Sequence, residues 1–188
     1  TSTPCGAFLY QNPGGYFAEQ PMKEIYDLCS QHGCLVIIDA YGGIGTPLCD
    51  GRYADIIVGS FGEWKLVEAG KGGFITWRSI AKELNLPEFG EEEMLVTILQ
   101  ELQKLPQRIS FLQRQREKII NDLSAFTILR PADIGFVVIV AYSQEEEKEK
   151  IINYCQNNQL EWTECPRYIR VQRPAISIEV KRLQDKVK

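Results

Sequence analysis

Short apolar runs that alternate with a helical stripe constrain the fold of this chain more than any other feature. Cys34–Ile38 is apolar at every position, which is typical of strands buried on both faces of a parallel sheet. Similar runs occur at Ala7–Tyr10, Ile56–Val58 and Gly73–Trp77. Apolar residues recur at helical spacing from Pro21 to about His32. This strand–helix–strand order, with short connections, predicts a βαβ unit and an α/β fold.

The second half of the chain has a different pattern. From about Glu91 to Leu123, apolar residues recur at steps of three and four, which predicts a long amphipathic helix. Ser143-x-x-Glu146 resembles a capping box and predicts a charged helix that ends near Asn157. Strands are predicted at three further places: 136–140, 160–163 and 176–180. Mixed helices and strands of this kind predict an α+β part.

Composition excludes several classes of function. The 188 residues carry a formal net charge of −4 without a cluster of Lys and Arg, so a nucleic-acid partner is not expected. Six cysteines form no C-x-x-C pair, and the single histidine, His32, cannot complete a metal site with them. No apolar run is long enough to span a membrane. We expect reduced thiols, a cytoplasmic location and neither a metal nor a membrane partner.

A carboxylate follows the most apolar of the predicted strands. Asp39 stands at the end of Cys34–Ile38, and ligands bind at the carboxyl ends of strands in parallel sheets. A carboxylate that is partly desolvated there needs a cationic or hydrogen-bonding partner. Asp is also common as the cap of a turn. The position of Asp39 alone therefore leaves both interpretations open.

A lysine lies in the loop after the next strand. Ser60 follows Ile56–Val58, Lys65 comes five residues later, and a glycine-rich stretch follows at 70–73. A semi-buried lysine beside a core strand suits Schiff-base chemistry. The hydroxyl of Ser60 and the amides of the glycines suit a phosphate group. By themselves these residues fit an ordinary surface loop equally well.

Together, the ordered segments resemble the DegT-type sugar aminotransferases, which are pyridoxal-phosphate enzymes of fold type I. The resemblance rests on Asp39-Ala40, Ala54-Asp55, Ser60-Phe61, Lys65 and Gly70-x-Gly72-Gly73. It implies that Lys65 binds the aldehyde of pyridoxal 5'-phosphate covalently. It also implies that Asp39 pairs with the pyridine nitrogen and that Ser60 contacts the phosphate. Lys65 and Asp39 would be catalytic, and these two residues and Ser60 would bind the cofactor.

Other features depart from this pattern. Gly42 stands where the family usually has a glutamine, and Lys71 where it usually has an acidic residue. The turn that begins at Asn12-Pro13 is similar to the Asn-Pro-Thr-Gly turn of the classical aminotransferases, in which the asparagine contacts the cofactor hydroxyl. Asn12 is therefore a fourth candidate cofactor ligand. This turn and the 54–59 segment are also similar to glycine decarboxylase, so the subfamily stays open.

The resemblance implies a division of the chain and a missing part. Residues 1–90 would be a partial large domain carrying the cofactor lysine. Residues 91–188 would be the linking helix and a C-terminal α+β small domain. Complete enzymes of this fold are about twice as long, so we expect a complementary chain that supplies the N-terminal half, or self-association. A small substrate bearing an amino group would be the other partner.

Two functions follow. The first is an aminotransferase that is active once its missing half is supplied, and the presence of both Asp39 and Lys65 favours it. The second is a catalytically inactive remnant that serves as an interaction or regulatory module on the same fold. The glycine at position 42 and the missing half favour this alternative.

Overall fold

The computed structural model describes residues 6–78, 92–167 and 170–184. The chain forms two compact units. The first consists of Thr1–Pro13 and Glu19–Leu105, and the second of Gly14–Ala18 and Pro106–Lys188. The helix α2 (Glu92–Asp122) contains the last boundary between them. The predicted division of the sequence at residues 90 and 91 stays a prediction.

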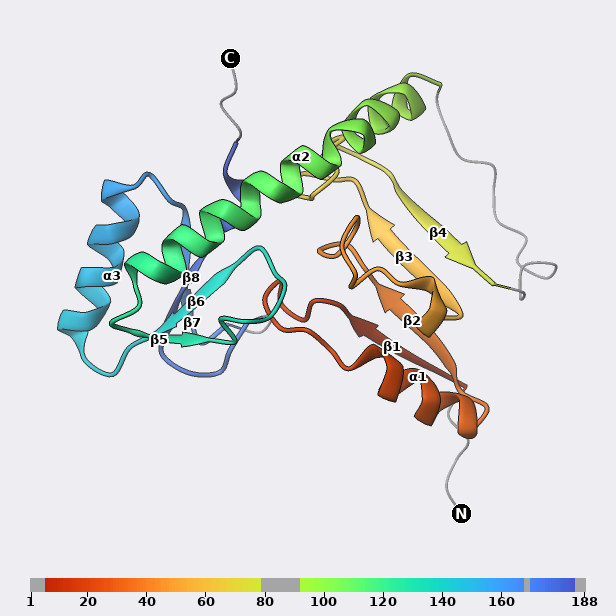
Figure 1. The fold of residues 1–188 in the computed structure, drawn as a ribbon, viewed down its shortest axis with the longest axis horizontal. Helices are drawn as coiled ribbons and strands as arrows, with labels where there is room; N and C mark the ends of the chain where they lie inside the picture. The colour runs from red at the N-terminus through yellow and green to blue at the C-terminus, as the bar shows by residue number, and fades with distance from the viewer. Residues whose placement is uncertain (1–5, 79–91, 168–169, 185–188) are drawn as a thin grey trace. The chain divides into compact units, whose positions relative to one another are not determined.

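The first unit contains a four-stranded sheet in the order β1-β2-β3-β4 (Figure 1). Its strands are β1 (Ala7–Gln11), β2 (Leu35–Asp39), β3 (Ile56–Ser60) and β4 (Gly73–Trp77). The helix α1 (Met22–Gln31) connects β1 to β2, and these two strands and β3 are parallel. A short 3-10 helix, η1 (Gly51–Tyr53), precedes β3. The predicted α/β class and βαβ unit are confirmed.

Two expectations about this sheet are wrong. Gly73–Trp77 was expected to resemble the strands of a parallel sheet, but β4 runs antiparallel to β3 because the loop 61–72 reverses the chain without a crossover helix. Ala7–Tyr10 was expected to be buried, but β1 lies at an edge of the sheet. The exposed fractions there are 43% for Phe8 and 63% for Leu9. An apolar run predicts a strand but not its place in the sheet.

The core of the first unit lies between α1 and the sheet. Val36 and Ile38 of β2 are fully buried and pack in one cluster with Met22 of α1 and Ile57 of β3. Successive strand residues point to opposite faces, so this cluster defines the face that α1 covers. Leu28, predicted as part of the apolar stripe of α1, is instead 58% exposed.

The second unit is an antiparallel sheet with helices. The strand order is β5-β6-β8-β7, with β5 (Thr127–Leu129), β6 (Val138–Ala141), β7 (Trp162–Cys165) and β8 (Ala175–Ile178). The helix α3 (Glu145–Asn157) connects β6 to β7, and the short 3-10 helix η3 (Val180–Arg182) follows β8. All residues of β6 and β8 are buried. The predicted α+β character of this part is confirmed.

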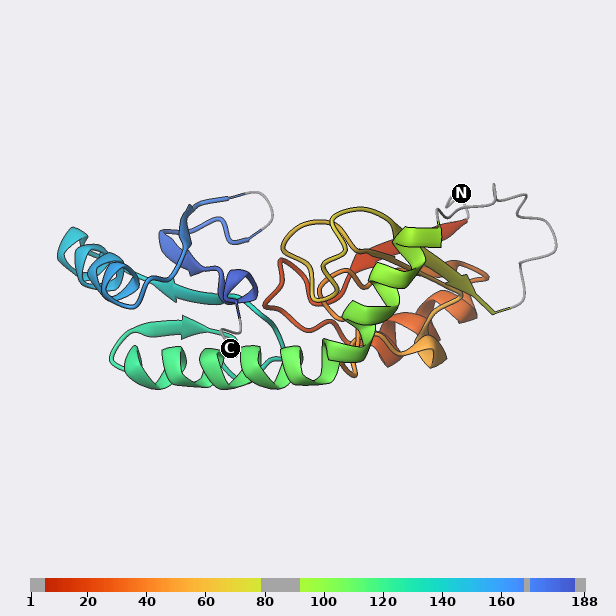
Figure 2. The same cartoon turned by 90° about the horizontal axis from the view of Figure 1, so that it is seen from above.

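The two long helices match the predicted periodicity closely. Figure 2 shows α2 as one uninterrupted helix, which continues through Pro106. The start of α3 differs from the prediction, because Gln144 and not Ser143 precedes its first turn, without a side-chain cap. Glu147, not Glu146, reaches back to accept a hydrogen bond from the Ser143 amide at 2.7 Å. The predicted capping box is therefore wrong by one residue.

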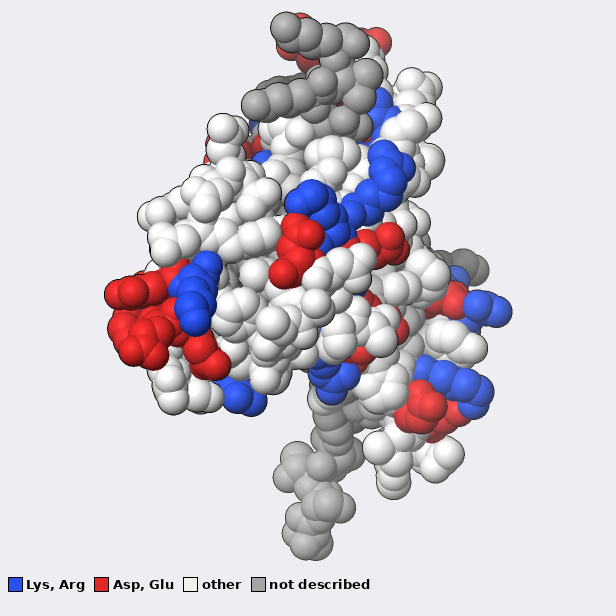
Figure 3. All heavy atoms as spheres, turned by 60° about the vertical axis from the view of Figure 1, so that its left-hand side comes forward, with Lys and Arg blue, Asp and Glu red and all other residues white. Residues whose placement is uncertain are grey.

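The surface carries charges of both signs. Figure 3 shows acidic and basic side chains interspersed on one face, with uncharged residues between them and no broad basic area. Within the described ranges, no helix combines the length and apolar character needed to cross a bilayer.

Candidate functional site

The four predicted site residues all belong to the first unit, and three of them follow the carboxyl ends of parallel strands. Asn12 follows β1, Asp39 ends β2 and Ser60 ends β3. The Asn12 amide donates a hydrogen bond to the Asp39 carbonyl at 3.0 Å, which holds these two residues side by side. Because parallel strands end at the same edge, the sheet brings these groups to the place where α/β proteins bind ligands.

Asp39 is half-buried at this edge. Its Oδ1 accepts a hydrogen bond from the Tyr41 amide at 3.2 Å. Burial raises the pKa of the Asp39 carboxyl, whereas the Tyr41 amide and the positive charge of Lys65 oppose that shift. The hydrogen bond is the turn contact that the alternative interpretation expected, but the electrostatic interaction with Lys65 goes beyond a turn cap.

Lys65 supplies the positive charge that interacts with the Asp39 carboxylate. Its neighbours Leu66 and Val67 are buried and anchor the loop, while Lys65 is half-buried. The Lys65 Nζ lies 4.1 Å from the centre of the Tyr41 ring. Burial lowers the pKa of the Lys65 amine, and Asp39 opposes this shift. A lowered pKa increases the fraction of neutral amine, which is the nucleophilic form.

The loop that carries Lys65 is closed at its base. The Phe61 amide donates to the Gly72 carbonyl at 3.0 Å, and the Ala69 amide donates to the Phe61 carbonyl at 2.8 Å. Ser60 Oγ accepts a hydrogen bond from the Gly62 amide at 3.3 Å. The Ser60 hydroxyl therefore lies at the turn into the loop, with the Gly62 amide beside it.

Trp64, immediately before Lys65, has a φ of 59°. This left-handed conformation costs a non-glycine residue about 1–2 kcal/mol, and such strain collects at functional sites. Trp64 is also 46% exposed. This conformation could not be predicted, because nothing local to a Ser-Phe-Gly-Glu-Trp-Lys segment requires it.

Asn12 is the predicted ligand whose side chain is most engaged with the protein. It is fully buried. Its Nδ2 donates to the Leu48 carbonyl at 3.3 Å, and its Oδ1 accepts from the Gln20 amide at 3.0 Å. A Cβ at Gly43 would lie only 2.8 Å from the Asn12 carbonyl, so the backbone is also tightly surrounded. These contacts hold the loop that follows β1, and the cofactor role of Asn12 stays a prediction.

Two further residues have roles that the motifs did not distinguish. Asp55, part of the resemblance, accepts a hydrogen bond from the Val36 amide at 2.7 Å. It stands before β3, at the amino ends of the strands, so its role in this structure is to hold the sheet. Tyr41 follows Asp39 by two residues in the sequence, and the structure places its ring against the Lys65 amine.

The described residues fit the cofactor that the resemblance implies. Lys65 offers an amine of lowered pKa, Asp39 offers a carboxylate at the same strand edge, and Ser60 offers a hydroxyl beside the Gly62 amide. No group of three metal-ligating side chains gathers within 6–78, 92–167 and 170–184. These groups suit an organic cofactor with an aldehyde, a basic ring nitrogen and an anionic group.

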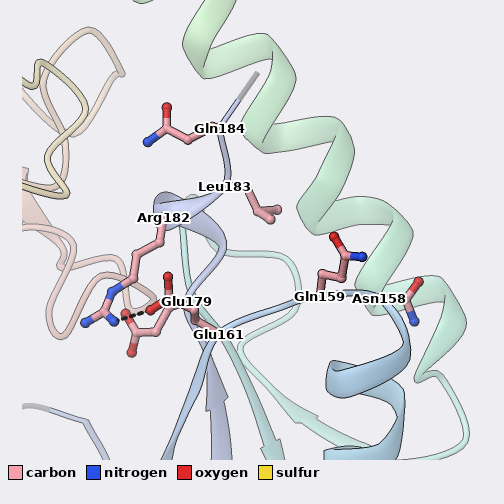
Figure 4. Close-up of a pocket in the computed structure, with 7 residues that line it drawn as sticks. All are labelled: Asn158, Gln159, Glu161, Glu179, Arg182, Leu183 and Gln184. Atoms are coloured by element: carbon pink, nitrogen blue, oxygen red, sulfur yellow. Dashed lines mark hydrogen bonds and ion pairs between the residues drawn. The ribbon is translucent and has the colours of Figure 1, made fainter. Parts of the chain in front are cut away.

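A separate polar cavity of about 230 Å³ lies within the second unit (Figure 4). Glu161 and Arg182 form an ion pair at 2.6 Å beside it, and Glu179 also lines it. The remaining lining residues are Asn158, Gln159, Leu183 and Gln184. None of the predicted site residues lines this cavity.

The four-stranded sheet and the α+β part have the fold of the aspartate-aminotransferase type. Residues 9–86 match the model of the DegT/DnrJ/EryC1/StrS aminotransferase family. The resemblance predicted from the sequence is thus confirmed over the segment that contains Asn12, Asp39, Ser60 and Lys65. The cofactor prediction is confirmed for that family, whose members depend on pyridoxal phosphate. No curated protein matches the chain.

Solved structures show the same fold at low sequence identity. The aminotransferase TlmJ from Streptoalloteichus hindustanus is 16% identical with a TM-score of 0.66, over 93% of this chain and 60% of that one. Helicobacter pylori PseC, an aminotransferase involved in the biosynthesis of pseudoaminic acid, is 15% identical with a TM-score of 0.63, over 93% and 61%. A serine palmitoyltransferase from S. paucimobilis is 15% identical with a TM-score of 0.65, over 94% and 50%.

The chain spans about 60% of the length of the first of these structures. What the solved structures add is therefore the fold of the described part, including the partial sheet and the α+β part.

Proposed function

We propose that this chain is the cofactor-lysine part of a pyridoxal-phosphate-dependent aminotransferase. The observation that carries the proposal is the electrostatic interaction between the half-buried Asp39 and Lys65 at the carboxyl edge of the sheet. A stable fold needs neither residue there, because each is partly desolvated at a cost in free energy. Bound pyridoxal phosphate would supply an electron-accepting ring next to the substrate amine.

In this proposal each residue has a distinct task. Lys65 would hold the cofactor covalently through its Nζ and, when free, would move a proton as general base and then acid. Asp39, whose carboxylate the Tyr41 amide orients, would hold the proton of the ring nitrogen. Ser60 would donate its hydroxyl hydrogen to the phosphate. Asn12 Nδ2, which donates one hydrogen to Leu48, would donate its other hydrogen to the cofactor hydroxyl.

The proposed activity requires more polypeptide than this chain provides. Since the chain spans about 60% of an aminotransferase such as TlmJ, we propose that a complementary chain or a second copy contributes the rest of the site. The substrate would be a small molecule with an amino group. The described cysteines are free thiols, which supports a reducing, cytoplasmic compartment.

The test is covalent capture of pyridoxal phosphate. Purified protein is incubated with the cofactor, reduced with borohydride and digested, and the modified lysine is located by mass spectrometry. We expect wild type and Lys71→Ala to carry the adduct at Lys65, and Lys65→Ala to carry none at the loop. Lys71 lies on the same loop and is the matched control. An adduct spread evenly over surface lysines, without preference for Lys65, would refute the assignment.

The alternative is a catalytically inactive remnant that acts as an interaction module. The observation that favours it is the engagement of the Asn12 amide by Leu48 and Gln20, together with the glycine at position 42. Absence of any adduct at Lys65, both alone and with lysate from the source, would select this alternative.

A further inference from the structure

Tyr41 contacts both of the residues that the proposed function makes catalytic. Its backbone amide donates a hydrogen bond to Asp39 Oδ1 at 3.2 Å. The centre of its ring lies 4.1 Å from Lys65 Nζ. Asp39 ends β2, and Lys65 lies in the loop that follows β3. Tyr41 therefore joins two segments of the first unit that are far apart in the sequence.

The contact between the ring and the amine has the geometry of a cation–π interaction. Such attraction extends to about 6 Å from the ring centre, and at 4.1 Å the Lys65 Nζ is also in van der Waals contact with the ring. By comparison, the guanidinium of the exposed Arg52 lies 5.6 Å from the centre of the Tyr53 ring. Tyr41 and Lys65 are both half-buried, and partial desolvation strengthens the attraction.

The ring acts on only one protonation state of Lys65. Its negative face attracts an ammonium group, whereas a neutral amine has no net charge for the face to attract. The ammonium form has no lone pair and is not a nucleophile. The contact with Tyr41 therefore favours the unreactive form of Lys65, and the ring covers one side of its nitrogen.

We propose that Tyr41 is a positioning residue that holds cofactor-free Lys65 as an ammonium against its ring and releases the amine when the proton leaves. The contact then sets the pH at which Lys65 becomes available to an aldehyde. Burial acts in the opposite direction, because it lowers the pKa of the amine. This inference deepens the proposed function and rests on it for the catalytic meaning of Lys65.

Other charges also influence Lys65. Asp39 opposes the effect of burial on the pKa of the amine. The loop that carries Lys65 also contains Glu63 and Glu68, whose charges favour the ammonium, and Lys71, whose charge disfavours it. These groups all stay in place when only the aromatic ring is removed. A change that follows the ring alone therefore reports the cation–π contact.

The experiment is the pH profile of acylation at Lys65, measured on the full chain without pyridoxal phosphate. A trace of acetic anhydride is added over a series of pH values, and peptide mass spectrometry gives the rate for each lysine. The midpoint of the profile reports the equilibrium between ammonium and amine, and the plateau at high pH reports accessibility. We expect Tyr41→Leu to move the midpoint to lower pH, with about a 2- to 5-fold change in that equilibrium.

Two controls separate the ring from other effects. Tyr41→Phe keeps the ring and removes the titratable hydroxyl, so it should retain the wild-type midpoint. Lys71 lies on the same loop, and its own midpoint should be the same in wild type and both variants. A higher plateau in Tyr41→Leu with an unchanged midpoint would mean that the ring only shields the amine, and would overturn the proposal. An equal shift in Tyr41→Phe would also overturn it, because the hydroxyl would then be responsible.

A measurement on the wild-type residue 41 does not depend on how its variants fold. In a chain labelled with ¹³C-lysine, the ring current of Tyr41 should move the Hε resonances of Lys65 upfield of those of Lys71 at low pH. The displacement should decrease as the ammonium loses its proton. Lys65→Arg identifies the resonances by their absence. Hε resonances of Lys65 that coincide with those of Lys71 at every pH would contradict the contact.

The proposed function and the role of Tyr41 can fail separately. Absence of a pyridoxal-phosphate adduct at Lys65 would refute the function, whereas the acylation profile is measured without the cofactor and would still show the effect of the ring. An unchanged midpoint in Tyr41→Leu would refute the role of Tyr41, even in a chain that captures the cofactor at Lys65.

Discussion

The two units differ in how much apolar side-chain surface they expose. All the large hydrophobic residues that are exposed among the described ones belong to the first unit: Phe8, Leu9, Leu28, Trp64, Ile75, Leu95, Val96, Leu99 and Leu102. In the second unit, every residue of β6 and β8 is buried. A self-contained core thus lies next in sequence to a partial one, which agrees with the shortfall in length against TlmJ.

Polar groups differ between the units as well. In the first, Asp39 and Lys65 are half-buried and each is shifted by burial toward its neutral form. In the second, Glu179 is buried between Arg170, at 3.1 Å, and Lys181, at 3.2 Å. Both cations also lie over the ring of Tyr16, at 5.1 and 4.5 Å from its centre. Glu179, Arg170 and Lys181 thus form a buried network of ion pairs, whereas Asp39 and Lys65 are only half-buried.

The largest effect is expected from breaking that buried network. Burial raises the pKa of Glu179, but Arg170 and Lys181 outweigh it and the pKa is lowered. Glu179→Gln leaves two buried cations without their carboxylate, and such a change costs about 3–5 kcal/mol. Urea unfolding followed by Trp162 fluorescence, from β7 of this unit, measures the loss. Glu161→Gln is the control: its carboxylate is 60% exposed, so its ion pair with Arg182 should contribute less than about 1 kcal/mol.

A second prediction compares two leucines of the same helix. Leu112 of α2 is fully buried and lies in the second unit, whereas Leu99 is 56% exposed in the first. Leu112→Ala should lower the free energy of unfolding by about 2–5 kcal/mol. Leu99→Ala should change it by less than about 0.5 kcal/mol. Equal losses in the urea midpoints of both variants would mean that the surface around Leu99 is covered in solution.

The interaction between Asp39 and Lys65 in the first unit leads to a prediction about pH. Burial lowers the pKa of Lys65, and the negative charge of Asp39 partly offsets this shift. Asp39→Asn removes only the offsetting charge, so the pKa of Lys65 should fall below its wild-type value. The neutral amine would then be present at lower pH, and acylation of Lys65, followed by peptide mass spectrometry, should begin at lower pH than in wild type. A shift toward higher pH would contradict the interaction.

The lowered pKa of Lys65 also makes the free energy of unfolding depend on pH. The folded-state pKa of Lys65 is lower than the ordinary pKa of a lysine, 10.5, so the unfolded state binds more protons between the two pKa values. Stability contributed by Lys65 therefore rises as pH increases through that interval. The contribution is reduced by solvent screening, because the side chain is only half-buried.

The smallest effect concerns the exposed leucines of α2. Leu95 and Leu102 are 54% and 39% exposed. Replacing both with Gln should change the free energy of unfolding by no more than about 0.5 kcal/mol per site. Binding of a fluorescent hydrophobic dye should fall in the same variant, because the apolar surface available to it is smaller. Unchanged dye fluorescence would show that this surface is not accessible in solution.

Much of the fold follows from local patterns. The βαβ unit, the long helix 92–122 and the α+β part all come from periodicity, because buried strands and amphipathic helices impose their repeat on the sequence. The small strand β5, Thr127–Leu129, was missed, since three residues are too few to show a period. The cap of α3 was predicted one residue too early. Glu146 and Glu147 are adjacent in the same turn, and it is Glu147 that accepts the hydrogen bond from the Ser143 amide.

The sequence also determined which residues stand at the strand ends, and hence that Asp39, Ser60 and Lys65 belong to one edge. Only the tertiary structure decided how each is used. It placed Tyr41 against the Lys65 amine, occupied the Asn12 amide with Leu48 and Gln20, and assigned Asp55 to holding the opposite end of the sheet. It also made β1 an exposed edge. Chain order fixes which residues follow a strand, whereas pairing and burial depend on residues far apart in sequence, whose contacts no local pattern encodes.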